Sequence, residues 1–161
     1  MNFVGKKLWS LIAILLSFLL LLSGCAKKEA TKPFELAEKI KESAPFAELS
    51  PLSGDKLSSH FGFTDAHVRR YSVLISSSGE SADTIAIFEI LEQDTKPTVV
   101  TGISGYLTQM SSSFKNTIEA EYNKVSSRVL MELDDIIVLV ICSDSQKVKD
   151  LLDQMGAKDL Y

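Results

Sequence analysis

Four short segments of the chain are rich in the apolar and β-branched residues of β-strands, whose successive side chains point to opposite faces. Segments 68–76 and 84–91 are separated by a polar turn, and segments 128–133 and 136–142 are separated by two aspartates. Each pair therefore predicts a β-hairpin. Segment 136–142 is apolar throughout, which predicts the most central strand. The first hairpin carries apolar residues on both faces, which indicates either burial from both sides or one face offered to a partner.

Apolar residues recur at spacings of three and four between these strands, which is the period of an amphipathic helix. This period predicts helices over 33–44, 55–60, 95–113 and 116–124, and a last helix between Asp144 and Gly156. The helix over 95–113 contains two glycines, each of which costs about 1 kcal/mol relative to alanine. With the stretches 95–113 and 116–124 counted as one helical region, the order α-α-β-β-α-β-β-α predicts an α+β fold: a four-stranded antiparallel sheet of two hairpins with helices packed on one face.

The first 25 residues have the charge and hydropathy pattern of a bacterial lipoprotein signal peptide. Lys6 and Lys7 precede an apolar run over 8–22, and Leu22-Ser23-Gly24-Cys25 ends it with small residues and a thiol. The run holds about 15 residues, or roughly 22 Å of helix, whereas a bilayer core is about 30 Å thick. We therefore expect cleavage before Cys25 and lipidation of its sulfur. An uncleaved anchor helix and a plain secretory signal are the alternatives.

Cleavage at this point divides the chain into a signal peptide at 1–24, a tether at 25–32 and a single α+β domain at 33–161. A diacylglycerol group on Cys25 supplies two acyl chains, and two chains give stable anchoring. The predicted location is the extracytoplasmic face of the cell membrane, and the membrane is a partner through the lipid anchor. The lysines of the tether either rest on anionic headgroups or belong to a solvated linker.

Charge and cysteine content narrow the classes of function. The formal net charge is −4, and it becomes more negative when the two lysines of the signal peptide are removed. An acidic domain without a basic stripe argues against a nucleic-acid partner. Because Cys25 is expected to carry lipid, Cys142 has no partner for an internal disulfide and is expected to be a buried core residue. No phosphate-binding glycine motif is present in the sequence, and no cofactor is predicted.

A serine-rich turn joins the first two predicted strands and is the candidate binding turn of the chain. Ser76, Ser77, Ser78 and Gly79 could present hydroxyl and backbone N–H groups to an anion or a sugar. The same residue types are common in hairpin turns, where they satisfy the backbone, and both interpretations stay open. The G-x-S-x-G pattern of a nucleophile elbow is absent from the sequence.

Histidines and acidic residues form no recognisable metal or catalytic motif. His60 and His67 have no cluster of further ligands around them in the sequence, so no metal site is predicted. Glu132, Asp134 and Asp135 fit a solvated hairpin tip better than a pair of carboxylates for acid–base catalysis. We therefore predict no catalytic residue.

Segments around the serine-rich turn resemble a known family. The residues that carry the resemblance are Tyr71-Ser72-Val73, Ser76-Ser77-Ser78-Gly79, Ala82-Asp83 and Ile85-Ala86-Ile87-Phe88. With the signal peptide, the tether and the acidic cap at Ser143-Asp144, the layout resembles that of uncharacterised lipoproteins of Gram-positive bacteria, whose family is designated domain of unknown function 4358. Asp134-Asp135 departs from the Gly- or Asn-containing turn of that pattern. The resemblance implies a surface location and a single domain, and it carries no activity and no catalytic residue.

The sequence thus predicts a membrane-anchored extracytoplasmic lipoprotein that acts as a non-catalytic binding or accessory module. Its partner would be an envelope protein or ligand that the sequence does not identify. Two alternatives stay open: an assembly factor of an envelope complex, and a small envelope hydrolase that uses a serine of the turn or a nearby acid.

Overall fold

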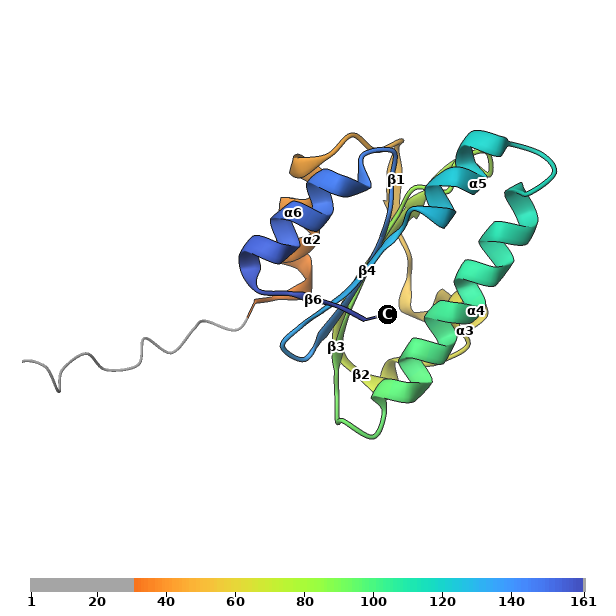
Figure 1. Cartoon of the computed structure of the whole chain (residues 1–161). Coiled ribbons are helices and arrows are strands. Elements are labelled where there is room, and N and C mark those ends of the chain that lie inside the picture. Colours follow the sequence, from red (N-terminus) through yellow and green to blue (C-terminus); the bar gives the residue numbers. More distant parts are fainter. Residues whose placement is uncertain (1–30, 161) are drawn as a thin grey trace, which may run out of the picture. The chain divides into compact units, whose positions relative to one another are not determined.

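A six-stranded antiparallel sheet forms the centre of the structure, a computed structural model that describes residues 31–160 (Figure 1). The strand order across the sheet is β1-β2-β3-β5-β4-β6. The strands are β1 (Leu49–Pro51), β2 (Val68–Ser76), β3 (Thr84–Ile90), β4 (Val129–Leu133), β5 (Ile136–Ile141) and β6 (Lys158–Asp159). The predicted signal peptide, Cys25 and the tether up to Ala30 lie outside the described residues.

Both predicted hairpins are confirmed, and they join through their most apolar strands. Val73 of β2 lies opposite Ala86 of β3, and Met131 of β4 lies opposite Val138 of β5. β3 also pairs with β5, with Ile87 opposite Val138, so these two strands occupy the middle of the sheet. Every residue of β3 and β5 is buried, as expected of strands that are covered on both faces.

Helices form in every described segment where the spacing of apolar residues predicts one. They are α2 (Pro33–Ser43), α3 (Leu57–Phe61), α4 (Lys96–Phe114), α5 (Glu119–Ser126) and α6 (Ser145–Met155), with single 3₁₀ turns at Gly54–Lys56 and Asp65–His67. The stripe of residues that α4 buries includes Val99, whereas Val100 is only partly buried. None of the described helices is both long enough and apolar enough to cross a membrane.

The prediction of four strands is wrong, because two short strands extend the sheet at its edges. β1 pairs with β2 over three residues, and β6 pairs with β4 over two. Segments of this length are too short to show alternation in the sequence. β6 forms because Gly156 ends α6 in a left-handed conformation (φ 89°). The N–H of Leu160 then donates to the carbonyl oxygen of Leu130 (3.1 Å).

Helices cover both faces of the sheet, so the prediction of helices on one face is wrong. The α4 face lies under α3, α4 and α5, and the α2–α6 face lies under α2 and α6 (Figure 1). Successive residues of a strand point to opposite faces. In β3, Ala86 and Phe88 therefore pack on the α4 face, and Ile85 and Ile87 pack on the α2–α6 face. Because β3 and β5 are apolar on both sides, two faces must be removed from water.

The two faces are packed with different kinds of side chains. Four aromatic rings meet on the α4 face: Phe61, Phe63, Phe88 and Tyr106. The ring centre of Phe88 lies 5.2 Å from those of both Phe61 and Phe63 in edge-to-face geometry, which is a preferred arrangement of aromatic pairs. The buried apolar residues of the α2–α6 face are aliphatic or sulfur-containing. The aromatic cluster joins α3 to α4, next to an open groove.

Candidate functional site

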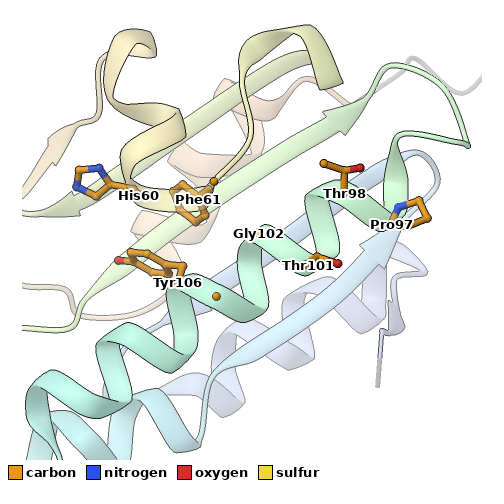
Figure 2. Close-up of a pocket in the computed structure, with 9 residues that line it drawn as sticks. His60, Phe61, Pro97, Thr98, Thr101, Gly102 and Tyr106 are labelled. Atoms are coloured by element: carbon orange, nitrogen blue, oxygen red, sulfur yellow. The ribbon is translucent and has the colours of Figure 1, made fainter.

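An open groove along α4, beside α3, is the candidate functional site of the described residues (Figure 2). The groove has a volume of about 510 Å³, which falls within the range of small-molecule sites. Its lining comes from the end of α3 and from the first half of α4: His60, Phe61, Gly62, Pro97, Thr98, Thr101, Gly102, Gly105 and Tyr106.

Two glycines of α4 shape the groove in different ways. A Cβ atom on Gly102 would lie 2.1 Å from the carbonyl oxygen of Phe61 and 2.5 Å from a ring carbon of Phe63. The end of α3 therefore packs directly onto the backbone of α4 at this point. A Cβ atom on Gly105 would meet nothing within 4 Å. Gly102 is thus required for packing, whereas Gly105 leaves open space in the groove at a cost to helix stability.

Tyr106 is fixed by stacking and by one hydrogen bond. Its ring stacks on Phe61 with ring centres 4.6 Å apart, and its hydroxyl oxygen lies 2.8 Å from Thr84 Oγ1. Thr84 donates its only hydroxyl proton to the carbonyl oxygen of Ala82 (3.0 Å), so Tyr106 is the donor. Burial raises the pKa of Tyr106. The phenol therefore stays protonated at neutral pH and serves as a fixed wall of the groove.

His60 stands at the end of α3, beside Tyr106 at the rim of the groove (Figure 2). Its Nδ1 lies 3.0 Å from the carbonyl oxygen of Lys56, and a carbonyl can only accept, so Nδ1 carries the proton. Ser59 donates to the same carbonyl (2.9 Å), and its Oγ lies 3.2 Å from Nδ1. A protonated Nδ1 cannot take a proton from Ser59, so this pair lacks the arrangement of an activated nucleophile.

A smaller cavity of about 240 Å³ adjoins the groove and brings the serine-rich turn close to it. His60 and Tyr106 line both cavities. The other walls of the smaller cavity come from the end of β2, the β2–β3 connection, the start of β3 and the second half of α4: Ile75, Ser76, Ser78, Gly79, Ser81, Asp83, Thr84, Gln109, Met110, Ser113 and Phe114. The structure thus places the candidate binding turn at one end of a line of cavities on the α4 face, a proximity that the sequence did not predict.

The hydroxyl groups of the turn are engaged within the protein. Ser76 Oγ donates to the carbonyl oxygen of Ser78 (3.1 Å) and accepts from the N–H of the same residue (3.2 Å). Ser78 Oγ accepts from the N–H of Glu80 (3.0 Å), and Ser77 Oγ lies 2.6 Å from Ser50 Oγ. These bonds are typical of a turn that satisfies its own backbone. A binding role for the turn stays a prediction.

A largely buried cluster of charges, which sequence reasoning missed, holds this turn to α5. Asp83 Oδ1 accepts from Lys124 Nζ (2.9 Å), and Asp83 Oδ2 accepts from the N–H of Ala47 (2.6 Å). Lys124 also pairs with Glu121 (3.0 Å), whose other oxygen accepts from the N–H of Ala82 (2.8 Å). The side chain of Asp83 is 3% exposed, so each oxygen needs the partner that it has. Contacts across 36 and 41 positions leave no pattern in the sequence.

Hydrogen bonds keep Glu121 and Lys124 of this cluster in their charged forms. Burial raises the pKa of Glu121, but bonds from Ala82 and Lys124 outweigh burial and leave this pKa below its ordinary value. Burial lowers the pKa of Lys124, but bonds to Asp83 and Glu121 leave it above its ordinary value. Glu121 and Lys124 therefore stay charged at neutral pH, and the cluster clamps the β2–β3 connection against α5.

Other residues that the sequence singled out are buried or paired. No group of three or more His, Cys, Asp or Glu side chains within residues 31–160 could hold a metal ion. Cys142 is buried, and burial raises the pKa of its thiol. Glu132 pairs with Lys96 (2.7 Å). Asp134 adopts a positive φ of 53°, so an aspartate takes the position in the turn that glycine or asparagine usually occupies.

The chain matches the model of a protein family described as Domain of unknown function (DUF4358) over residues 42–142. The matched range contains β1 to β5 and α3 to α5, and it leaves out α6 and all but the last two residues of α2. Both the groove and the serine-rich turn fall within it. No curated protein matches the chain, and no solved structure matches it.

Proposed function

The chain belongs to the DUF4358 family, whose description assigns no activity, and we propose that it is a lipid-anchored extracytoplasmic binding module without catalytic activity. The anchor is a diacylglycerol group on Cys25, and the binding site is the groove between α3 and α4. One observation carries this proposal: a basic start, a short apolar run and a cysteine precede a small domain with an open groove.

The N-terminal sequence supports a lipid anchor in place of a membrane-spanning helix. The apolar run ends at Leu22, and Ser23 and Gly24 separate it from Cys25. Small residues before the cleavage site allow a peptidase to bind the backbone in extended form. Two acyl chains on the sulfur of Cys25 anchor the chain by burial of their methylenes, each worth about 0.8 kcal/mol.

The groove supports binding more than catalysis. Thr98 and Thr101 are exposed along it and offer hydroxyl groups to a ligand, while the bare backbone at Gly105 allows close approach. Tyr106 donates its proton to Thr84. Ser59 donates its proton to the carbonyl oxygen of Lys56. The groove therefore offers a shaped surface, and these hydroxyl protons are already engaged inside the protein.

The mass of the native protein tests the anchor. We expect a mature chain that begins at Cys25 and carries the added mass of a diacylglycerol group, and we expect the Cys25→Ala variant to lack this mass. Cys142→Ala is the matched control, because its thiol is buried in the core and its loss should leave lipidation unchanged. A native chain that retains Met1 and carries no acyl mass would contradict the anchor.

Hydrogen exchange tests the groove as the binding site. Isolated cell-envelope material should slow amide exchange in α3 and in the first half of α4, and it should leave exchange in α6 unchanged. Gly105→Trp should abolish this protection, because the new ring fills space where a Cβ atom meets nothing within 4 Å.

Thr108→Trp is the matched control for the groove, since Thr108 is exposed on the same helix and lines no part of the groove. This variant should keep the protection of α3 and α4. Equal exchange of the wild-type protein with and without envelope material would contradict the groove as a binding site.

A further inference from the structure

Cations surround the most exposed large apolar side chain of the described residues. Phe34, in the first turn of α2, is 67% exposed. It lines a cavity of about 530 Å³ together with Lys32, Arg69 and Arg70. These four residues are the α2–β2 patch, because they come from the start of α2 and the start of β2. The lining of the same cavity contains one acidic residue, Asp65.

The positive charge of the α2–β2 patch is turned outward. Arg69 and Arg70 both pair with Glu89, but the arginine side chains are 60% and 44% exposed, whereas that of Glu89 is 11% exposed. The carboxylate therefore lies beneath the guanidinium groups, whose remaining donors face solvent. Lys32 pairs with Glu35 on the open surface (3.1 Å), and an exposed pair of this kind holds its cation weakly. The patch can thus bind anions from outside.

The patch lies near the N-terminal start of the domain, a few residues after the proposed anchor at Cys25. Lys32 follows Cys25 by seven residues, and seven residues span at most about 25 Å. A bilayer that holds a lipid on Cys25 is therefore within reach of Phe34. Lys27 and Lys28 stand between the anchor and the patch in the sequence, which adds positive charge to the same approach.

We propose that the α2–β2 patch rests on the anionic phospholipid surface that holds the anchor, an inference that depends on lipidation of Cys25. The ring of Phe34 enters the boundary between headgroups and acyl chains, as aromatic residues of interfacial helices do. Lys32, Arg69 and Arg70 bind lipid phosphates, and their alkyl stems cover apolar surface around the ring. The patch therefore orients the domain on the membrane.

Acidic residues limit the contact on one side. The carbonyl oxygen of Leu91 accepts from Arg69 Nη2 (3.3 Å), and Glu92 and Asp94 follow Leu91 in the sequence. Like charges repel an anionic surface, so the contact ends at Arg69. The groove shares no lining residue with the patch and lies on the α4 face, across the sheet from α2. Docking therefore leaves the groove open to a ligand.

Tryptophan at position 34 reports on this contact. Trp9 is the only tryptophan in the sequence and precedes Cys25, so the mature Phe34→Trp protein carries a single indole. The lipidated protein is extracted from membranes and reconstituted into phosphatidylglycerol vesicles that contain brominated lipid. We expect strong quenching of the indole emission and a shift of the emission to shorter wavelength.

Glu80→Trp is the matched control. Glu80 is exposed in the turn that follows the far end of β2. This substitution removes a negative charge, which by itself favours approach to an anionic membrane. Weak quenching of the Glu80→Trp protein would therefore show that the quenching at position 34 is specific to the patch.

In the Phe34→Trp background, Arg69→Gln should lower the ratio of docked to undocked domains about fivefold. Lys115→Gln, at an exposed lysine on the connection between α4 and α5, should leave this ratio unchanged.

Equal quenching in the Phe34→Trp and Glu80→Trp proteins overturns the inference. So does quenching of the Phe34→Trp protein that is unchanged on vesicles of phosphatidylcholine, which carries no net charge. The mass of the same preparation shows whether Cys25 carries lipid. A protein that is anchored but not docked is therefore distinguished from a protein without an anchor, in which the proposed function fails and this inference fails with it.

Discussion

The two faces of the sheet are built from the same strands, but cavities are distributed differently along the helices that cover them. On the α2–α6 face, the helices line cavities through their N-terminal halves. On the α4 face, α4 lines three cavities from its first turn to its last, with volumes of about 510, 570 and 240 Å³. The helices of one side thus line cavities of about 240 and 530 Å³ beside their N-terminal halves, whereas α4 on the other side is flanked by cavities along its whole length.

The side chains on the outer surfaces of the helices explain this difference. On α6, the long side chain of Lys149 pairs with Asp153 of the same helix (3.6 Å) and with Asp159 of β6 (2.8 Å). On α4, Ser104 and Thr108 each donate a hydroxyl to the carbonyl oxygen four residues earlier (3.0 and 2.9 Å). Short side chains that bond to their own helix cover little of the neighbouring surface. The open face is therefore encoded by the small residues of α4.

The family match follows the same division between the faces. The matched residues 42–142 include five strands and the three helices of the α4 face. They include no part of α6 and only the end of α2. We therefore expect a function that DUF4358 proteins share to reside on the α4 face, and features built on α2 itself, such as Lys32 and Phe34 of the α2–β2 patch, to be more specific to this chain.

The largest effect of a substitution is expected where charges tie the two faces together. Asp83 accepts from Ala47, which follows α2, and from Lys124 of α5. Lys124→Met would leave a carboxylate that is 3% exposed without its cation. Removal of one partner from a buried pair costs about 3–5 kcal/mol, and urea unfolding at neutral pH measures the loss. Lys115→Met, at an exposed lysine, should unfold at nearly the wild-type urea concentration.

Stability measurements at acidic pH distinguish the electrostatic effect of Lys124→Met from its effect on packing. Burial raises the pKa of Glu121, and bonds from Ala82 and Lys124 lower it by more. A carboxyl with a depressed folded-state pKa stabilises the fold above its unfolded-state pKa and loses this contribution as the pH falls through the folded-state value. Acid therefore weakens the wild-type cluster by protonating Glu121, whereas the variant lacks the bond from Lys124 to Glu121 and has less of this contribution to lose. The difference in stability should shrink below about pH 4, whereas a constant difference would point to packing alone.

The spacing of apolar residues predicted the helices and strands that form the core, because a buried helix or strand must present apolar residues at regular intervals. Both hairpins form, and segment 136–142 becomes the central strand β5. The helix over 95–113 forms despite two glycines, since its apolar stripe reaches the aromatic cluster. These features depend on residues that are close in the sequence, and so the sequence reveals them.

Features that depend on distant parts of the chain could not be predicted in the same way. β1 and β6 exist because neighbouring strands offer unpaired backbone groups, and the sequence of two or three residues carries no sign of this. The covering of both faces depends on where α2 and α6 dock. In the sequence, Gly102 and Gly105 are equivalent, and the position of α3 alone makes one of them a packing contact and the other a part of the groove.

Gly102→Ala should loosen the α4 face and leave the α2–α6 face intact. The new Cβ atom would lie 2.1 Å from the carbonyl oxygen of Phe61, and a backbone atom in a packed helix cannot move aside without separating α3 from α4. Overpacking of this kind costs about 1–3 kcal/mol. Native-state hydrogen exchange should speed up in α3 and α4 before it does so in α6. A variant as stable as the wild type would show that α3 does not rest on the backbone of α4.

Gly105→Ala, the same substitution three residues later, should have the smaller effect and the opposite sign. A Cβ atom there meets nothing within 4 Å, so the gain in helix propensity of about 0.5–1 kcal/mol is unopposed. Thermal unfolding should show a rise of a few degrees. Because both glycines lie in one helix, the difference between the two variants isolates the contact with α3. If the more stable Gly105→Ala protein also protects α3 and α4 less on envelope material, then glycine at 105 serves binding at the expense of stability.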